Sequence, residues 1–242
     1  MQCYGLIGRK LDHSFSKSYF MHKFANEKID AMYELYPLEE ISDFKILINS
    51  DQRICGLNVT IPYKQSVIPY LDKLSEEVVN IGAVNCIAIR NGVLYGYNTD
   101  IEGIAATLNT LDIAPDTQAL VLGTGGAAQA VCYVLKQRGI GYMSVSRSSN
   151  RAEITYDTLP KQIIESHKLI INTTPLGMFP DIDSAPDIDY SAIGAEHRIF
   201  DLVYNPFPTR FMELCRAKGA TTIGGSLMLE TQAEASWRIW QQ

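Results

Sequence analysis

One lysine and one aspartate in this chain stand among side chains that suit proton transfer. Lys64 lies in N-V-T-I-P-Y-K (residues 58–64), and Asp100 lies in G-Y-N-T-D-I-E-G (residues 96–103). When a ketone is reduced by hydride, negative charge grows on its oxygen, and a donor must supply a proton as that charge develops. An ammonium group with a carboxylate partner can do this, so Lys64 and Asp100 are the candidate catalytic pair.

Neutral hydrogen-bonding side chains accompany this pair: Ser14, Ser16, Asn58, Thr60 and Asn85. Asn58 and Thr60 alternate with apolar residues, so they lie on one face of a strand predicted over residues 56–61. A set of neutral donors with one cation and one carboxylate suits a polyhydroxylated acid as ligand. Taken singly, Lys64 is an ordinary surface cation and Asp100 a favourable charge in the first turn of a helix. The hypothesis therefore depends on the combination.

A glycine-rich turn, G-T-G-G-A-A, occupies residues 123–128. It lies between a predicted strand (119–122) and a predicted helix (127–138), which is the context that gives such a turn its meaning. Small residues let backbone N–H groups approach a pyrophosphate, and the helix N-terminus adds partial positive charge. The alternative is a tight turn without a ligand. The residues predicted to cradle the pyrophosphate are Gly123, Gly125, Gly126, Ala127 and Ala128.

The segment after the next predicted strand (142–146) indicates which dinucleotide binds. NAD enzymes usually carry a carboxylate here for the ribose 2′-hydroxyl. This chain has S-R-S-S-N-R at residues 146–151 instead. Ser146, Arg147 and Arg151 would accommodate a 2′-phosphate, and no carboxylate is present there to repel one. The sequence therefore predicts NADP, with a solvated basic loop as the alternative.

The elements that must position these residues alternate between strand-like and helix-like segments, which is typical of α/β proteins. Besides those above, we expect strands at 3–8, 169–172 and 199–203, and helices at 16–27, after Pro62, from about Thr99 and in the tail from Gly225. The expected fold class is α/β with two domains: an N-terminal α/β domain with a mostly parallel sheet and a Rossmann-like domain, with a cleft between them.

Composition excludes several other classes of protein. The 242 residues are 46% hydrophobic and 20% charged, which is ordinary for a globular chain. A net charge of −6 argues against a nucleic-acid partner. No signal peptide and no apolar run long enough for a bilayer is evident, and the scattered cysteines contain no C-x-x-C pair. We expect a cytoplasmic protein with reduced thiols, no membrane partner and no metal.

Seven motifs, in order over nearly the whole chain, resemble the shikimate dehydrogenase family. They are H-S-F-S (13–16), N-V-T-I-P-Y-K (58–64), G-A-V-N (82–85), G-Y-N-T-D-I-E-G (96–103), N-T-T-P-L-G-M (172–178), D-L-V-Y-N-P (201–206) and G-G-S-L-M-L-E-T-Q (224–232). The resemblance implies reversible, NADPH-dependent reduction of 3-dehydroshikimate to shikimate, a step in aromatic amino-acid biosynthesis. We expect a monomer or a homodimer.

The resemblance assigns a role to each matching residue. Lys64 would be the acid/base, and Asp100 would orient it and hold a substrate hydroxyl. Ring hydroxyls would be bound by Asn58, Thr60, Asn85 and Gln232, and the carboxylate by Ser14, Ser16 and Tyr204. Further cofactor contacts would come from Thr173, Gly225 and Met228, with Met228 near the nicotinamide. The substrate domain would comprise residues 1–100 and 225–242, and the NADP domain residues 101–224.

The chain departs from the family pattern in three places. Lys17 replaces the proline that commonly follows H-S-x-S, and the histidine expected a few residues later falls at Phe20 or Met21. The usual N-R-T of the 2′-phosphate loop reads S-R-S, which keeps Arg147. The chain is also shorter than most relatives. The alternatives are a quinate/shikimate dehydrogenase of broader substrate and cofactor range, a catalytically silent NADP-binding regulator, or a methyltransferase, which would want an acidic residue after the second strand.

Overall fold

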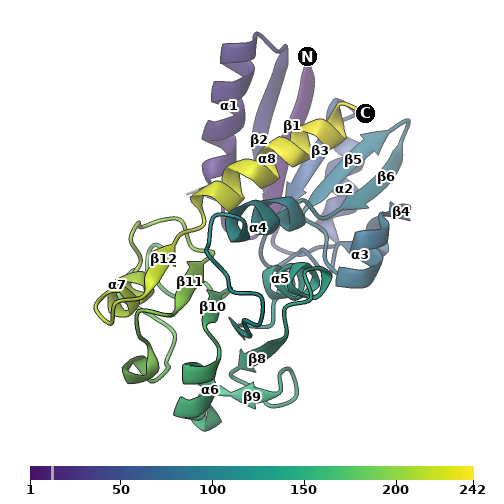
Figure 1. Cartoon of the computed structure of the whole chain (residues 1–242). Helices are drawn as coiled ribbons and strands as arrows, with labels where there is room; N and C mark the ends of the chain where they lie inside the picture. The colour runs from purple at the N-terminus through teal and green to yellow at the C-terminus, as the bar shows by residue number, and fades with distance from the viewer. Residues whose placement is uncertain (12–13) are drawn as a thin grey trace. The chain divides into compact units, whose positions relative to one another are not determined.

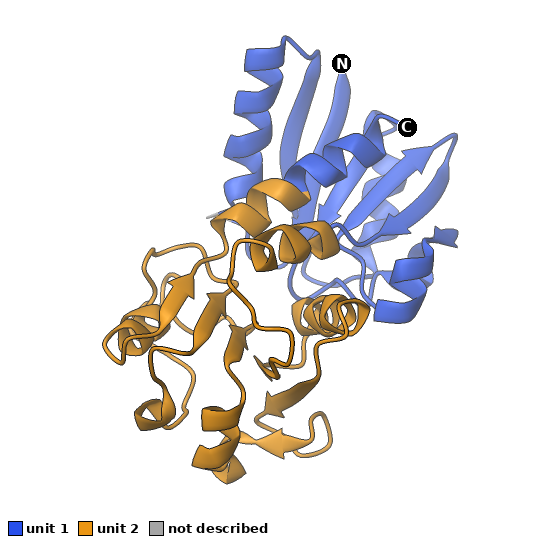
Figure 2. Cartoon of the chain, viewed as in Figure 1, with its two compact units in different colours: residues 1–99, 233–242 blue, residues 100–232 orange. Residues whose placement is uncertain are grey.

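The computed structural model describes residues 1–11 and 14–242 (Figure 1), so His13 of the H-S-F-S motif lies outside the described residues. Contacts within the chain divide it into unit 1 (Met1–Thr99 with Ala233–Gln242) and unit 2 (Asp100–Gln232), as coloured in Figure 2. Each unit has its own mostly parallel sheet, which confirms the α/β class. Helix α8 (Ser226–Trp240) begins in unit 2 and ends in unit 1. Residues 225–232 of the tail belong to unit 2 and residues 233–242 to unit 1.

The sheet of unit 1 has the strand order β2-β1-β3-β5-β6-β4. Its strands are β1 (Gln2–Gly8), β2 (Ala31–Pro37), β3 (Ile54–Val59), β4 (Lys73–Leu74), β5 (Cys86–Arg90) and β6 (Val93–Tyr97). Its helices are α1 (Phe15–Glu27), α2 (Asp43–Ser50), α3 (Glu76–Ile81) and the 3-10 turn η1 (Ile68–Tyr70). Strand β5 runs antiparallel to β3 and β6, and the other pairs are parallel. The carboxyl ends of β1, β3 and β6 therefore share one edge with the start of β5.

Side chains that alternate along the strands build a core on each face of this sheet. Tyr4 of β1 packs with Phe20 of α1 and Trp240 of α8, and the Tyr4 and Trp240 rings are 4.8 Å apart. On the other face, Ile7 belongs to a cluster with Phe44 of α2. Helices α1 and α8 thus cover one face and α2 and α3 the other.

Gly56 of β3 lies directly under Trp240, and we expect Gly56→Ala to lower the free energy of unfolding by about 1–3 kcal/mol. A Cβ atom at this position would overlap the indole ring. The ring is held in place because its Nε1 donates to the Ile87 carbonyl at 3.0 Å. Urea unfolding measures the change. Gly194→Ala is the control, since an added Cβ there meets nothing within 4 Å, and equal stability of both variants would contradict the expected clash.

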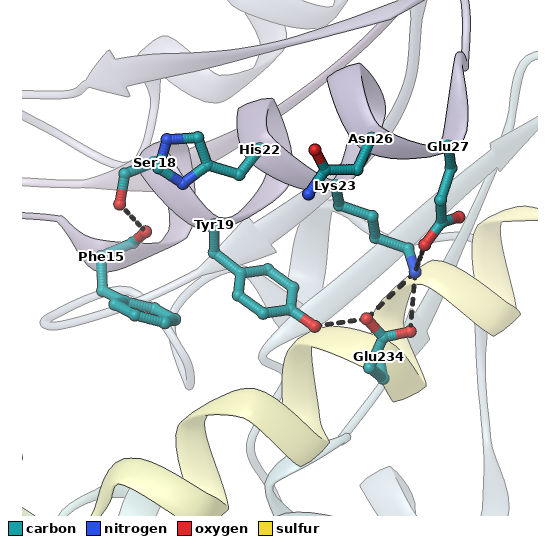
Figure 3. Close-up of a pocket in the computed structure, with 8 residues that line it drawn as sticks. All are labelled: Phe15, Ser18, Tyr19, His22, Lys23, Asn26, Glu27 and Glu234. Atoms are coloured by element: carbon teal, nitrogen blue, oxygen red, sulfur yellow. Dashed lines mark hydrogen bonds and ion pairs between the residues drawn. The ribbon is translucent and has the colours of Figure 1, made fainter.

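Helices α1 and α8 are joined at the surface of unit 1 by charged groups around Glu234 (Figure 3). Lys23 Nζ donates to both Glu234 oxygens at 3.0 Å and to Glu27 at 2.8 Å. The Tyr19 hydroxyl also donates to Glu234. Burial acts to raise the pKa of Glu234, but the hydrogen bonds from Tyr19 and Lys23 outweigh it and leave this pKa below its usual value.

We expect Glu234→Gln to destabilise the fold by about 1 kcal/mol at pH 7, because Lys23 loses an ionic partner. A carboxyl whose folded pKa is lowered stabilises the fold above its unfolded pKa, and this stabilisation is lost as the pH falls through the folded value. The difference from the wild type should therefore vanish in acid, as measured by urea unfolding from pH 7 downward. Glu165→Gln, in an exposed ion pair, is the control. A difference that persists in acid would contradict the ionic origin.

The sheet of unit 2 is parallel throughout, in the order β12-β11-β10-β7-β8-β9. Its strands are β7 (Ala119–Leu122), β8 (Tyr142–Ser146), β9 (Ile154–Thr155), β10 (Leu169–Asn172), β11 (Arg198–Asp201) and β12 (Thr221–Ile223). Its helices are α4 (Asp100–Leu108), α5 (Gly126–Gln137), α6 (Lys161–Ser166) and α7 (Arg210–Arg216), with 3-10 turns η2 (Tyr156–Thr158) and η3 (Tyr190–Ala192). One core packs under α4 and α5 and the other under α6 and α7.

Most expected helices and strands are confirmed, but the prediction of a helix after Pro62 is wrong. Residues 61–67 form turns. Tyr63 is buried, and its hydroxyl donates to two backbone carbonyls of the loop after β2. The carbonyl of Lys64 accepts from the Val84 N–H at 2.7 Å. Because that carbonyl bonds to another segment instead of to the next helical turn, the helix cannot continue.

The state of the cysteines and the lengths of the helices complete the description of the fold. The cysteines are free thiols, with Cys3, Cys86 and Cys215 buried and Cys55 and Cys132 half-buried. Among the described residues, no helix combines the length and the apolar composition needed to cross a bilayer.

Candidate active site

The carboxyl edge of the unit 1 sheet gathers the predicted substrate residues of that unit. Thr60 and Lys64 follow β3, and Asn85 immediately precedes β5. Ser14 stands at the N-cap of α1, in the connection that follows β1, and Ser16 lies in the first turn of that helix. Because these connections leave the sheet at the same edge, residues far apart in the sequence meet there.

Asn58 is the centre of a buried hydrogen-bond network at this edge. It is 4% exposed, and its Oδ1 accepts from the Tyr33 hydroxyl at 2.9 Å. Its Nδ2 donates to Ser236 Oγ at 2.9 Å and to the Asn85 carbonyl at 3.3 Å. Tyr33 is also hydrogen-bonded to Ser16. Both amide hydrogens of Asn58 are thus used in hydrogen bonds within the protein. A ligand hydroxyl would therefore have to donate to the Asn58 Oδ1.

The network continues from Asn85 to the end of β6. The Asn85 Oδ1 accepts from the Thr99 N–H at 2.6 Å, and its Nδ2 donates to Thr99 Oγ1 at 3.0 Å. Thr99 Oγ1 is also 3.1 Å from Ser236 Oγ, which lies in α8. The amide of Asn85 is therefore fixed in one orientation.

The candidate catalytic residues are attached to this network through the backbone. Val84, the neighbour of Asn85, donates to the Lys64 carbonyl, and Lys64 is half-buried. Asp100 is 3% exposed and is the first residue of α4. It directly follows Thr99, which Asn85 fixes. Lys64 belongs to unit 1 and Asp100 to unit 2.

The carboxyl edge of the unit 2 sheet gathers the predicted cofactor residues. The loops that leave this edge carry Gly123 after β7, Ser146 and Arg147 at β8, Thr173 after β10 and Gly225 after β12. Tyr204, predicted to bind the substrate carboxylate, follows β11. Strands β8 and β10 flank β7 on opposite sides. In open parallel sheets, ligands bind at such a reversal of strand order, outside the carboxyl ends.

The glycine turn after β7 fits a pyrophosphate. Gly123 has φ +112°, and a Cβ there would lie 2.5 Å from Thr173 Oγ1. Gly125 is the N-cap of α5, and a Cβ on it would meet nothing within 4 Å. The first N–H groups of the helix, including those at Gly126, Ala127 and Ala128, thus begin beside open space that an anion could occupy.

The loop over residues 147–153 carries the predicted 2′-phosphate residues. Arg147 and Arg151 are exposed, while Ser146 is 7% exposed at the end of β8. Ser146 Oγ accepts from the Ser148 N–H at 3.3 Å, which shapes the start of the loop. The loop connects the parallel neighbours β8 and β9 without a helix, which is shorter than the usual crossover. Both exposed arginines therefore lie on one short segment.

The remaining predicted residues lie on α8 or at the loop before it. Met228 is 8% exposed and packs against Gly103 of α4. Gln232 Nε2 donates to the Leu229 carbonyl at 2.9 Å. Gly225 is buried, and a Cβ on it would overlap the Leu202 carbonyl.

Sequence reasoning missed three residues that hold the unit 1 network: Tyr33, Thr99 and Ser236. Thr99 stands inside the G-Y-N-T-D motif, so its motif position was a usable signal. No sequence signal marked Tyr33 or Ser236, because a tyrosine in a strand and a serine in a helix are ordinary residues. Only the fold brings these two side chains to Asn58.

Comparisons with known proteins identify the family of the chain. Residues 6–87 match the family model described as the shikimate dehydrogenase substrate binding domain. The chain is 40% identical to the shikimate dehydrogenase (NADP(+)) of Clostridium beijerinckii, over 100% of this chain and 93% of the relative. It also resembles the crystal structure of shikimate dehydrogenase 1 from Peptoclostridium difficile, with a TM-score of 0.86, 35% identity and coverage of 100% and 92% of the two chains.

The chain also resembles a second solved structure, that of shikimate 5-dehydrogenase from Thermus thermophilus in complex with NADP(H) and shikimate. It matches with a TM-score of 0.89 and 29% identity, over 99% of this chain and 93% of that one. The similarity to these proteins covers both units. The chain belongs to the shikimate dehydrogenase family.

Proposed function

We propose that this protein is an NADP-dependent shikimate dehydrogenase, which reversibly reduces the ketone of 3-dehydroshikimate to the alcohol of shikimate. The observation that carries the proposal is the network around Asn58 and Asn85, which fixes neutral polar groups at the sheet edge beside the Lys64 segment. A polyhydroxylated ring needs such oriented donors and acceptors. Full-length similarity to enzymes of this name supports the same substrate.

Proton transfer is the task of Lys64. The bound nicotinamide would supply hydride to the carbonyl carbon. As the C=O π electrons move onto oxygen, the Lys64 ammonium donates a proton to it, so that the alcohol forms and a neutral amine remains. Solvent then reprotonates the amine. Asp100 orients Lys64 and accepts a hydrogen bond from a ring hydroxyl.

Substrate binding is divided between the hydroxyls and the carboxylate of the ring. We assign the ring hydroxyls to Asn58, Thr60, Asn85 and Gln232, and the carboxylate to Ser14, Ser16 and Tyr204. Hydroxyl donors can hold a carboxylate without a neighbouring cation, because each hydrogen bond to an anion is charge-assisted.

Cofactor binding uses the carboxyl edge of unit 2. Gly123, Gly125, Gly126, Ala127 and Ala128 would hold the pyrophosphate, and Ser146, Arg147 and Arg151 the 2′-phosphate. Thr173, Gly225 and Met228 would contact the nicotinamide half. The open space at Gly125 and the exposure of both arginines support this assignment.

The test is oxidation of purified shikimate with NADP, followed at the nicotinamide absorbance. The same assay with quinate, and with NAD in place of NADP, separates this function from a broader quinate/shikimate dehydrogenase. Turnover with shikimate and NADP well above the other three combinations is expected. Binding of NADP with no turnover would indicate a regulator instead.

We also propose that the enzyme works in the cytoplasm as a monomer or homodimer. The free thiols, two of them half-buried, are typical of a reducing compartment. Size-exclusion chromatography with light scattering decides the oligomeric state, and a larger assembly would contradict the proposal.

A further inference from the structure

Asp201 ends β11 inside unit 2 and is 0% exposed. Three groups donate hydrogen bonds to its carboxylate: Thr209 Oγ1 at 2.6 Å, Asn172 Nδ2 at 2.9 Å and the Val203 N–H at 3.1 Å. Among the described residues, no lysine or arginine forms an ion pair with it. The carboxylate is thus held by neutral donors alone.

The Asn172 contact extends the network into the loop after β10. While Nδ2 of Asn172 donates to Asp201, its Oδ1 accepts from the Thr174 N–H at 3.0 Å and from Thr174 Oγ1 at 2.6 Å. Turning the amide over would lose the bonds to Asp201 and to the Thr174 N–H. Asp201 therefore fixes the orientation of Asn172, and through it the position of Thr174.

The loop after β10 is in direct contact with the glycine turn. Thr173 donates from its N–H and its Oγ1 to the Leu122 carbonyl, at 2.9 and 2.7 Å. A Cβ on Gly123 would lie 2.5 Å from Thr173 Oγ1 and 3.2 Å from Thr174 Cγ2. A displaced loop would therefore displace the turn that is proposed to hold the pyrophosphate.

The contacts of Asp201 with Val203 and Thr209 hold the loop after β11 in place. Asp201 accepts from the Val203 N–H, next to Tyr204, and from Thr209. Thr209 Oγ1 in turn accepts from the Met212 N–H at 3.2 Å as the N-cap of α7. Both ends of the segment between β11 and α7 are thus tied to one carboxylate.

We propose that Asp201 is a positioning residue for the cofactor, whose ionised form holds the loops after β10 and β11 against the glycine turn and whose loss of charge weakens NADP binding. The inference rests on the proposed NADP dependence. An ionised carboxylate only accepts hydrogen bonds, so it matches three donors. A protonated acid or an amide would donate to Thr209 Oγ1 instead, and Asn172 and Val203 would then donate to a neutral oxygen, so these bonds would lose their charge assistance.

Burial raises the pKa of Asp201 to about 6, although the three hydrogen bonds act to lower it. The titratable side chains that interact with it are Tyr190 of η3 and Cys215 of α7. Burial raises the pKa of both, that of Cys215 to about 12, so both are neutral near pH 6. The carboxyl of Asp201 is therefore the group among them that changes charge there.

The raised pKa of Asp201 bears on the stability of the fold. Because the folded pKa lies above the ordinary carboxyl value, the ionised form lowers the stability of the fold above about pH 6, and this cost is absent below about pH 4. Asp201→Asn should therefore fold, which makes its ligand binding measurable.

The test is the dissociation constant of NADP, measured by titration calorimetry without shikimate, for the wild type and Asp201→Asn from pH 5 to 8. At pH 7.5 the variant should bind NADP roughly tenfold more weakly, within the usual range of coupling between sites. As the pH falls through 6, wild-type binding should weaken toward that of the variant. The 2′-phosphate of NADP also titrates near pH 6. Its titration affects NADP binding to the wild type and to the variant alike, so it cancels in the ratio of the two dissociation constants.

Two further variants complete the design. Asp189→Asn, which changes an exposed aspartate that caps η3, should leave the dissociation constant unchanged. Thr209→Val removes one hydrogen bond to the carboxylate, so the pH midpoint of NADP binding should rise by about one unit. This second shift tests the inference even if Asp201→Asn fails to fold.

A ratio of the two dissociation constants that stays near one at every pH would overturn the inference, as would an unmoved midpoint in Thr209→Val. Failure of the proposed function looks different: the wild type itself would neither bind NADP at pH 7.5 nor oxidise shikimate.

Discussion

Lys64→Ala should lower kcat for shikimate oxidation by about 10²–10⁴ while changing KM only modestly. The variant loses the group that accepts the proton as the ketone forms, and water would have to replace it. The loss should belong mainly to the transition state, because the ring hydroxyls would keep the partners proposed for them, Asn58, Thr60 and Asn85. Steady-state kinetics with NADP saturating measure both constants.

Lys45→Ala is the matched control for this variant. Lys45 also lies in unit 1, where its ammonium stands over the Tyr70 ring 5.5 Å from the centroid, and its removal should leave kcat unchanged. Near-normal turnover of Lys64→Ala would remove Lys64 from the mechanism. A large rise in KM with kcat retained would instead make Lys64 a binding residue.

Arg147→Asp should raise the KM for NADP by about 10²-fold and that for NAD by less than about threefold. The substitution removes the guanidinium proposed to bind the 2′-phosphate and places a carboxylate where NAD enzymes bind the ribose hydroxyl. The expected result is a reversal or near-reversal of cofactor preference, measured as the ratio of kcat/KM with the two cofactors.

Arg210→Asp controls for the change in net charge, because Arg210 is also exposed in unit 2 and forms an ion pair with Glu213 of its own helix. It should leave the cofactor ratio unchanged. If Arg147→Asp raised the KM values for NADP and NAD equally, the contact with the 2′-phosphate would be refuted. Arg147 would then contact a part of the cofactor that NADP and NAD share.

The extent of local prediction is clearest in unit 2. Strands β7, β8 and β10 have the bounds that the apolar runs predicted, and α5 begins one residue earlier than expected. Short runs rich in apolar residues are strong local signals, and in β7 and β8 a neighbouring glycine marks one end of the strand. The glycine turn and the arginine loop follow from those strands, so their place at one edge could be inferred without a structure.

The Lys64 segment marks where local reasoning stopped. Pro62 suits the first turn of a helix, and the sequence offered no local reason against one. The Tyr63 hydroxyl and the Lys64 carbonyl instead bond to the loop after β2 and to Val84. Contacts with segments about 20 residues away decide the conformation there, and a pattern of neighbours cannot report them.

The sequence by itself determined which residue types are available for chemistry and at which strand ends they stand, because strand periodicity and motif spacing are written into adjacent residues. Tertiary structure alone decided how they are held. Ser236 reaches Asn58 across 178 positions, and Asp201 reaches Asn172 across 29. Such bonds form only after the sheets and α8 have packed, since a hydrogen bond between distant segments is stable only where burial has already removed water from both partners.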